Sequence, residues 1–401
     1  MKNTSRIYRF SNAVLHALFI CACIIFAQQA EAQVQCGADR WNLYKDLLKG
    51  EKVALVVNQT AQVGDSSLVD YLIKQGVEVV KIFAPEHGFR GDQDAGQEFK
   101  DWVDSLTGVP VISLYGQRKK PTGEDLAGVD ILIFDIQDVG ARFYTYISTL
   151  HYIMESCAES DKPLLILDRP NPNGNYIDGP VLEAGFESFV GMHRVPIVHG
   201  MTIGEYARMI NGENWLKDGK QCNLQVIKCK NYDHNTFYAP KIKPSPNLPN
   251  ITAILLYPSI CLFEGTNVSL GRGTEWPFQV IGMPGYERGE FTFTPMPTAG
   301  AKNPPFKGLQ CKGYDLSRSN VEELFNRRHL DLEYLILFYK NTTKGRYFLE
   351  NGFFDKLAGD KQLRMDIEAG KTSRQISDSW QPGLKQFQLT RKKYLLYKDF
   401  H

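Results

Sequence analysis

The chain has 401 residues, and its hydrophobic, aromatic and charged fractions of 43%, 12% and 23% are those of an ordinary globular protein. Its formal net charge is +1, and it contains no block of like charges of the kind that marks a nucleic-acid-binding arm. The length allows two domains or one large one. Electrostatics therefore gives no support to a nucleic-acid partner and selects no other partner.

The first 32 residues read as a signal peptide. A basic start is followed by an apolar run over residues 13–27, and the basic residues are Lys2, Arg6 and Arg9. Ala30-Glu31-Ala32 fits the small-x-small cleavage pattern and places the mature start near Gln33. The chain is therefore expected to be exported, to the periplasm or outside the cell.

Two alternatives to a cleaved signal peptide are weaker. The apolar run is too short for a membrane span of roughly 20 residues, and polar Gln28 and Gln29 follow it at once, so no stable membrane span is expected. A lipoprotein acylated at Cys23 is less favoured because the residues after Cys23 are apolar, whereas a lipid-anchored chain usually turns polar there.

Six cysteines remain beyond the signal peptide: Cys36, Cys157, Cys222, Cys229, Cys261 and Cys311. An even number in an exported chain permits disulfides, and Cys222 could bridge locally to Cys229. Buried free thiols are the equal alternative. No Cys-x-x-Cys pair occurs, so a structural zinc site is not expected.

The first two thirds of the chain alternate short apolar runs with amphipathic stretches. Strands are predicted over 53–57, 77–83, 109–114, 131–134 and 163–167, and helices over 67–75 and 146–159. Near-continuous Val, Ile and Leu runs separated by helices indicate a parallel sheet buried on both faces. We therefore predict a doubly wound α/β domain with a mostly parallel sheet over residues 33–240.

Residues 239–249 carry four prolines and are expected to form an extended connection to a second domain. A strand is predicted over 290–294, and helices over 320–339, 362–368 and 381–389. Residues 241–401 are therefore predicted to form a smaller α+β domain that packs against the open edge or top of the first.

Polar residues follow each predicted strand of the first domain, in segments 58–60, 85–91, 115–118, 135–142 and 168–174. Parallel strands all point the same way, so these segments should converge on one rim, where ligands of open α/β sheets bind. The rim lacks several familiar signatures. No G-x-G-x-x-G follows the first strand, and the chain has no Walker A, G-x-S-x-G or H-E-x-x-H sequence. No cofactor is expected.

Carboxyl groups with amides and arginines suit glycoside hydrolysis, which typically uses one carboxyl group as acid and a second as base or nucleophile. Glu86 is the first catalytic candidate, because Pro85, Gly88 and Gly91 form a turn that could present it; an ion pair with Arg90 is the alternative. Asp135 and Asp138 are further candidates, one of which is expected to cap the following turn.

His87 is the fourth catalytic candidate. It could instead join Asp138 and His199 as a metal ligand, although a lone histidine is more often a hydrogen-bonded structural residue, and no metal is expected. Tyr144 and Tyr146 are candidates for stacking on a sugar ring, or for the buried start of a helix.

Long motifs along the chain resemble those of one bacterial family, the exo-β-N-acetylmuramidases of the NamZ type. The motifs are Asn58-Gln-Thr60, Pro85-Glu-His-Gly-Phe-Arg-Gly91, Phe134 to Tyr146, Leu167-Asp-Arg-Pro-Asn-Pro172, His199 to Glu205, Pro244 to Pro249, Phe263 to Ser269 and Gly271-Arg-Gly-Thr274. They occur in order over nearly the whole mature chain. The resemblance implies that residues 33–240 are a Rossmann-like catalytic domain and that residues 241–401 close a cleft between the two domains. It also implies release of terminal N-acetylmuramic acid (MurNAc) from the non-reducing ends of peptidoglycan-derived sugars or muropeptides.

Within these motifs, polar side chains are candidates for binding the substrate: Asn58, Asp168, Asn171, His199, Glu205 and Asn247. MurNAc carries a lactyl carboxylate that a bidentate arginine would suit, and Arg142, Arg169 and Arg272 are the candidates; structural salt bridges are the alternative for each. Glu264 and Asn267 of the second domain could close the cleft.

Two other classes of function stay open on the sequence. One is a cell-wall glycan-binding protein with a degenerate site, which the acids at the rim argue against. The other is a metal-dependent hydrolase or amidase that uses His87, Asp138 and His199.

Overall fold

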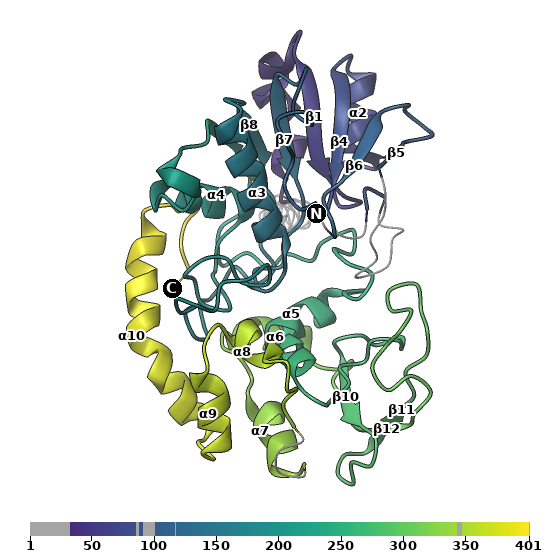
Figure 1. The fold of residues 1–401 in the computed structure, drawn as a ribbon, viewed down its shortest axis with the longest axis vertical. Helices are drawn as coiled ribbons and strands as arrows, with labels where there is room; N and C mark the ends of the chain where they lie inside the picture. The colour runs from purple at the N-terminus through teal and green to yellow at the C-terminus, as the bar shows by residue number, and fades with distance from the viewer. Residues whose placement is uncertain (1–32, 86–87, 91–100, 117, 343–346, 401) are drawn as a thin grey trace, which may run out of the picture.

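The structure is a computed structural model that describes residues 33–85, 88–90, 101–116, 118–342 and 347–400. Figure 1 shows two parts stacked along the long axis, a sheet with its helices at the top and a smaller part below. The predicted α/β class, with a second and smaller domain, is confirmed.

A seven-stranded sheet of order β5-β6-β4-β1-β7-β8-β9 forms the centre of the first part. Its strands are β1 (Lys52–Val57), β4 (Glu78–Ala84), β5 (Trp102–Val103), β6 (Pro110–Ser113), β7 (Ile131–Asp135), β8 (Leu164–Leu167) and β9 (Leu224–Ile227). Only the edge strand β5 pairs antiparallel among these. The parallel strands follow the Rossmann order, so the direction of winding reverses between β1 and β7.

Helices cover both faces of this sheet because its strands are apolar on both sides. Ala54 and Val56 of β1 pack in a cluster with α3 (Tyr146–Glu159) and α4 (Ile203–Gly212). Val53, Leu55 and Val57 pack on the other face with α2 (Leu68–Lys74) and three short 3₁₀ turns, η1 (Gly37–Asp39), η2 (Trp41–Leu43) and η3 (Lys45–Leu48). The small elements of this part are β2 (Gln62–Val63), β3 (Ser66–Ser67) and η4 (Lys217–Gly219).

The second part combines helices with a three-stranded antiparallel sheet of order β10-β12-β11. Its elements are α5 (Ile251–Ile260), η5 (Cys261–Gly265), β10 (Val280–Met283), β11 (Phe291–Phe293), β12 (Cys311–Asp315), α6 (Val321–Arg327), α7 (Glu333–Lys340), α8 (Phe353–Ala358) and α9 (Gln362–Glu368). Leu255 and Phe338 of this part lie in the same hydrophobic cluster as Phe134 and Ile147 of the first. One continuous core therefore joins the two parts.

The last helix returns the chain to the first part. Figure 1 shows α10 (Ser373–Lys392) running along one side of the molecule from α9 toward α4. At its end, the Arg391 guanidinium donates to the Gly200 carbonyl at 2.9 and 2.6 Å. The Tyr397 hydroxyl then donates to Oδ2 of Asp168 at 2.7 Å.

Two helix predictions were wrong. Residues 320–339 form two helices rather than one, because Arg328 takes a left-handed conformation with φ of 53° and ends α6. The Leu330 amide then donates to Asp178 at 2.8 Å, which fixes the break. The helix predicted over 381–389 begins much earlier, since Thr372 and Gln375 form a capping box at its start.

The cysteines are buried free thiols, which was the alternative to disulfides. All six described cysteines are free and buried, including Cys222 and Cys229. The Cys229 thiol donates to the Asp168 carbonyl at 3.2 Å. In the described part of the chain no helix combines the length and apolar character needed to cross a membrane.

Candidate active site

Two cavities adjoin one another, and the inner one lies where the two parts of the molecule meet. The inner cavity, of about 220 Å³, lies at the carboxyl ends of β6 and β7, between Tyr115, the segment 143–146 and the connection residues 245–248. The outer cavity, of about 980 Å³, is lined by the second part, chiefly residues 264–272 and the loop 300–306. Glu264 and Arg272 line both.

Aromatic rings form the wall of the inner cavity on the sheet side. The rings of Tyr144 and Tyr146 meet edge to face at 4.9 Å, and Tyr257 packs on Tyr144 at 5.7 Å. The Tyr144 hydroxyl donates to the Pro244 carbonyl, and Asn58 donates to the Tyr146 hydroxyl, both at 2.9 Å. These bonds hold the ring positions, so the wall of the inner cavity combines fixed aromatic rings with polar groups.

An ion pair stands at the junction of the two cavities. Nε of Arg272 donates to Oε1 of Glu264 at 2.9 Å, and the guanidinium lies 4.9 Å from the ring centre of Phe278. Burial opposes the charge of Arg272, but Glu264 outweighs it and raises the pKa of the guanidinium. The Arg272 and Glu264 side chains keep 26% and 23% of their surface exposed, so both face the cavities as charges.

Asn247 also belongs to this site. It lines the inner cavity and donates from Nδ2 to the Gly300 carbonyl at 2.8 Å, which ties the loop 300–306 to the inner wall. Asn267 lines the outer cavity. Six of the predicted residues therefore meet here: Tyr144, Tyr146, Asn247, Glu264, Asn267 and Arg272.

Arg142 does not lie at the cavities and is corrected to a structural residue. Its side chain is fully buried, and Nη1 donates to the carbonyls of Pro180 and Val195 at 2.9 and 2.6 Å. Nη2 donates to the carbonyls of Leu357 and Ala358 at the end of α8. The guanidinium is therefore occupied in holding the second part to the first, away from any lactyl carboxylate.

Arg169 and Asp135 pair with each other. Nη2 of Arg169 donates to Oδ2 of Asp135 at 2.9 Å, and its Nε donates to Oδ1, while both side chains are buried. Burial works against the guanidinium charge, but Asp135 outweighs it and raises the pKa of Arg169. The pair stands at the ends of β7 and β8 and serves as a structural salt bridge, which is the alternative considered for this arginine.

Asp138 and His199 form a buried pair beneath the rim. His199 Nε2 lies 3.7 Å from Oδ2 of Asp138, and that oxygen accepts from the Gly140 amide at 2.7 Å. Burial raises the pKa of Asp138 to about 7 and lowers that of His199 to about 3. Neither residue lines the two cavities described above. Asp138 accepts from the Gly140 amide and therefore caps the turn after β7, the role expected for either Asp135 or Asp138. Among the described residues, no group of three His, Cys, Asp or Glu is placed to hold a metal ion.

The remaining polar candidates of the first part are buried in hydrogen-bond networks. Asp168 accepts from Thr202, the Gly204 amide and Tyr397. Glu205 accepts from the Thr202 amide and meets His234 at 3.0 Å. Asn171 donates to the Met201 carbonyl at 2.9 Å. These motif residues hold the loops that follow β8, and the structure does not bring them to the two cavities.

Glu86 and His87 lie outside the described residues, so their catalytic roles stay predictions. On the described side of that segment, Ala84 pairs with Ser113 across β4 and β6, and Ser113 lies two residues before Tyr115 of the inner cavity. Arg90, the alternative partner of Glu86, donates to both carboxylate oxygens of Asp104, at 3.0 and 2.8 Å.

The strands of the sheet run parallel as predicted, and the described residues that follow them line two separate cavities. Tyr115 and residues 143–146 face the inner cavity. Thr60, Gln137 and Arg169 line a separate cavity of about 380 Å³ near residues 237–242.

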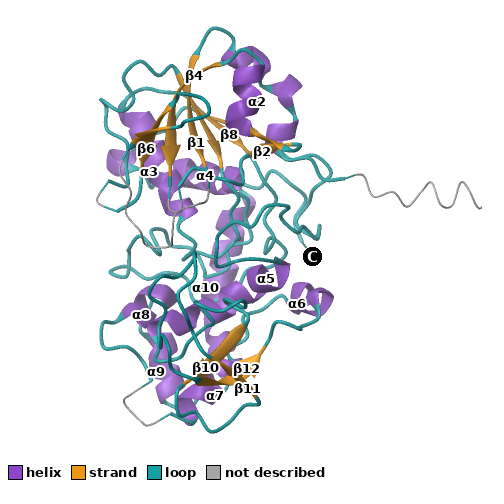
Figure 2. Cartoon of the chain, turned by 90° about the vertical axis from the view of Figure 1, so that its right-hand side faces the viewer, coloured by secondary structure: helices purple, strands orange, loops and turns teal. Residues whose placement is uncertain are grey.

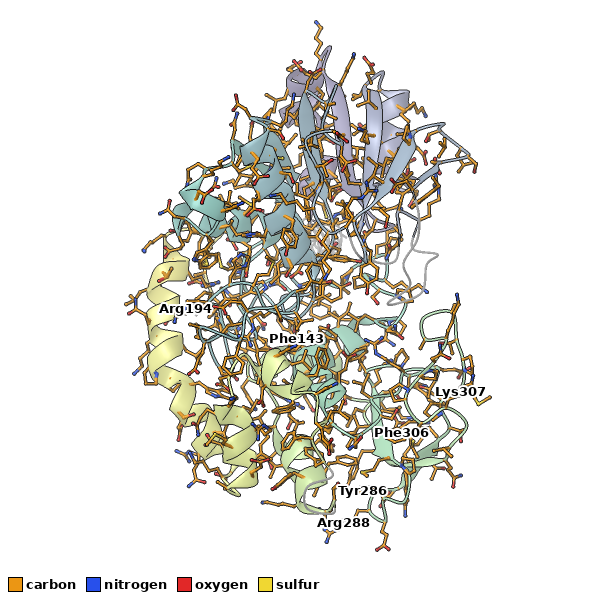
Figure 3. All side chains as sticks on the ribbon, viewed as in Figure 1. Phe143, Arg194, Tyr286, Arg288, Phe306 and Lys307 are labelled. Atoms are coloured by element: carbon orange, nitrogen blue, oxygen red, sulfur yellow. The ribbon has the colours of Figure 1, made fainter. Side chains whose placement is uncertain are left out.

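Sequence reasoning missed the aromatic residues of the second part. Figure 3 places Phe143 where the two parts meet and Phe306 within the second part, near Lys307. Phe278 lines the inner cavity and Phe306 the outer one, and both have a left-handed backbone with φ of 59°. No motif marks them, although Phe278 follows the Gly271–Thr274 motif closely.

Comparison with known proteins matches this architecture over its whole length. Residues 53–252 match the model of the N-terminal part of exo-β-N-acetylmuramidase NamZ, and residues 255–397 match its C-terminal part. The peptidoglycan β-N-acetylmuramidase NamZ of Bacillus subtilis (strain 168) is 42% identical over 373 residues, 88% of this chain and 89% of that protein.

Two crystal structures of DUF1343 family proteins from Bacteroides fragilis NCTC 9343 are similar in fold. One has a TM-score of 0.86 at 48% identity, over 92% of this chain and all of that one. The other has a TM-score of 0.75 at 30% identity, over 91% and 99% of the two chains. The chain belongs to the exo-β-N-acetylmuramidase NamZ family.

Proposed function

We propose that this protein is an exo-acting glycoside hydrolase that releases terminal MurNAc from the non-reducing ends of peptidoglycan fragments. The observation that carries the proposal is the match to the peptidoglycan β-N-acetylmuramidase NamZ along almost the full length of both chains. Both halves of the family model match, at residues 53–252 and 255–397, which supports the proposal for the chain as a whole.

The inner cavity fits one terminal sugar of this kind. Aromatic faces suit the apolar face of a pyranose ring, and Arg272 offers a cation to the lactyl carboxylate that distinguishes MurNAc from N-acetylglucosamine (GlcNAc). Arg142 and Arg169 do not line the two cavities, whereas Arg272 lines both, so Arg272 is the arginine that we assign to the lactyl group. Its pair with Glu264 holds the guanidinium in place before the substrate arrives.

Cleavage needs a proton for the leaving oxygen and a second carboxyl group as base or nucleophile. Glu264 is the carboxylate among the described lining residues of both cavities. Glu86 remains the proposed acid on the motif that carries the family resemblance. In this proposal Asp135 and Asp138, which are both buried, have structural roles.

The test is turnover of a chromogenic MurNAc glycoside by the purified protein, beside the matching GlcNAc glycoside and after exhaustive chelation. We expect release from the MurNAc glycoside, a rate on the GlcNAc glycoside lower by at least roughly a hundredfold, and activity that survives chelation. No release would favour the glycan-binding alternative. Loss on chelation with recovery on added zinc would favour the metal-dependent hydrolase.

We also propose that residues 1–32 export the protein, which would place it where peptidoglycan fragments are released during cell-wall turnover. The basic, apolar and small-x-small segments support this placement. Acylation at Cys23 is the less favoured form of the same proposal. N-terminal sequencing of the mature protein distinguishes them, since cleavage after Ala32 leaves Gln33 first.

A further inference from the structure

We propose that the outer cavity is the binding site for the leaving part of the glycan, and that Phe306 is the surface on which its first sugar ring stacks. The inference rests on the proposed function, since it divides the substrate between two cavities. The outer site would take GlcNAc-headed oligosaccharides, the products that remain after the terminal MurNAc has been removed.

The sizes of the two cavities support this division. The inner cavity measures about 220 Å³, which is below the range of about 300–1,000 Å³ typical for drug-sized ligands and suits a single sugar. The outer cavity measures about 980 Å³, enough for more than one ring. An enzyme that removes one terminal sugar needs a small site on one side of the cleaved bond and room for a chain on the other.

The residues shared by the two cavities indicate where the cleaved glycosidic bond would lie. Glu264 and Arg272 are the residues that the two cavities share, so a glycan that runs from one cavity to the other passes this ion pair. Asn247 of the inner wall donates to the Gly300 carbonyl, where the loop 300–306 begins. The loop that lines the outer cavity is therefore fixed to the wall of the inner one.

Phe306 is held in an unfavourable backbone conformation. Its φ of 59° lies in the left-handed region, which is costly for a bulky residue and is maintained only where the surroundings enforce it. Neighbouring bonds do so: the Leu309 amide donates to the Phe306 carbonyl, and the Gly308 amide donates to the Pro295 carbonyl, both at 2.9 Å. Such strain concentrates at ligand sites, and here it keeps a half-buried ring in the wall of the outer cavity.

The ring itself has two surroundings. It packs against the small hydrophobic cluster of Val280, Phe293 and Cys311, and it also lines the outer cavity. An aromatic ring supported from behind in this way offers a rigid apolar face, the surface on which a sugar ring of a glycan stacks.

The variant that tests the inference is Phe306→Gly, because glycine adopts the left-handed backbone without strain while the ring is lost. Phe306→Tyr keeps the ring. Lys307→Ala is the matched control, an exposed neighbour that does not line the cavity. Two substrates are compared, MurNAc β-fluoride, whose leaving group is a single atom, and a MurNAc-terminated tetrasaccharide, whose leaving group is a trisaccharide.

We expect Phe306→Gly to lower the ratio of kcat/KM on the tetrasaccharide to kcat/KM on the fluoride by on the order of tenfold. Phe306→Tyr and Lys307→Ala should keep the wild-type ratio. Isothermal titration calorimetry with the GlcNAc-headed trisaccharide should show binding to the wild type that weakens by a similar factor in Phe306→Gly.

The outcomes separate the two proposals. An unchanged ratio in Phe306→Gly, with active wild-type enzyme, overturns the outer-cavity assignment and keeps the muramidase. Absence of turnover by the wild type, with trisaccharide binding that depends on Phe306, overturns the muramidase and keeps the glycan site. Neither turnover nor binding overturns both.

Discussion

Asp138 illustrates how burial decides the role of a single acid. Its carboxylate is enclosed, Oδ1 has no hydrogen-bond partner, and its neighbour His199 is kept neutral by burial. The loss of solvation raises the pKa of Asp138 from its ordinary value of 3.8 to about 7. In the folded protein this group therefore holds a proton through a pH range in which the unfolded chain has lost it.

Stability should consequently depend on pH through Asp138. Between about pH 4 and pH 7 the folded state binds more protons than the unfolded state, so the contribution of this group to stability falls as pH rises through that window and levels off above it. At about 1.4 kcal/mol per unit of pKa shift, the full loss is of order 4 kcal/mol.

The measurement compares urea unfolding of the wild type and Asp138→Asn at pH 4.5 and pH 8. We expect the variant to gain a few kcal/mol relative to the wild type on going to pH 8. Asp378→Asn, on a side chain with 69% of its surface exposed, is the control and should show no such change. A difference that is the same at both pH values would contradict the account of Asp138.

Glu86 carries the proposed acid chemistry. We expect Glu86→Gln to leave the unfolding transition unchanged and to lower kcat by at least roughly a hundredfold, the scale of general acid catalysis. Kinetics on the chromogenic MurNAc glycoside check this, with Glu51→Gln, an acid before β1 at the opposite end of the sheet, as control. A variant that retains most of its activity would remove Glu86 from the mechanism.

For single residues, the sequence identified candidate site residues but could not tell which of them line the site and which are structural. Arg142, Arg169 and Arg272 stood on equal terms, and only the fold separates them. Arg142 is enclosed by carbonyls that include that of Leu357, 215 residues away along the chain. Motifs reveal which residues matter and give no measure of such distant contacts. Phe306 lies in none of the recognised motifs, because its proposed role in stacking a sugar ring depends on its left-handed backbone conformation.

Among the elements, those with strong periodicity were predicted well. The helix predicted over 146–159 matches α3 residue for residue, since ten of its residues are buried and set a clear pattern. The helix predicted over 320–339 failed because apolar Leu330 and Leu332 continue the pattern through a break. Tertiary bonds from Leu330 to Asp178 and from Asp331 to Ser259 cause that break, and local sequence does not encode them.

The contact between α8 and the loop before α3 depends on Arg142. We expect Arg142→Gln to lower the free energy of unfolding by about 3 kcal/mol or more, because a shorter amide leaves buried carbonyls without donors. Arg194→Gln, an exposed arginine in the same part of the chain, should change it by less than about 0.5 kcal/mol. Equal effects of the two variants on urea unfolding would show that the buried bonds contribute little.

For the whole molecule, the two parts act as one body because α10 and the segment after it bind back to the sheet. Figure 1 and Figure 2 show α10 running from the level of the lower helices up toward the part that holds the large sheet. Tyr397 donates to the buried Asp168 and accepts from the Cys229 amide at 2.8 Å. The sequence predicted two domains, whereas the shared core and this return of the chain depend on contacts between distant segments.

Removal of the Tyr397 hydroxyl tests how much the contact of the C-terminal segment with the first part stabilises the fold. We expect Tyr397→Phe to reduce the free energy of unfolding by about 1–3 kcal/mol, since Asp168 and the Cys229 amide each lose a buried partner. Tyr394→Phe removes a hydroxyl that donates to Glu213, whose side chain is 27% exposed, and should cost less. Chemical denaturation measures both, and a larger effect for Tyr394→Phe would contradict this assignment.

The direction of cleavage tests the central claim most directly. The substrate is a MurNAc-GlcNAc-MurNAc-GlcNAc tetrasaccharide labelled at its reducing end, with products followed over time by mass spectrometry. An exo-acting β-N-acetylmuramidase should give free MurNAc and one labelled trisaccharide that begins with GlcNAc and resists further cleavage. A labelled disaccharide in the first products, or no cleavage of the tetrasaccharide, would contradict the account.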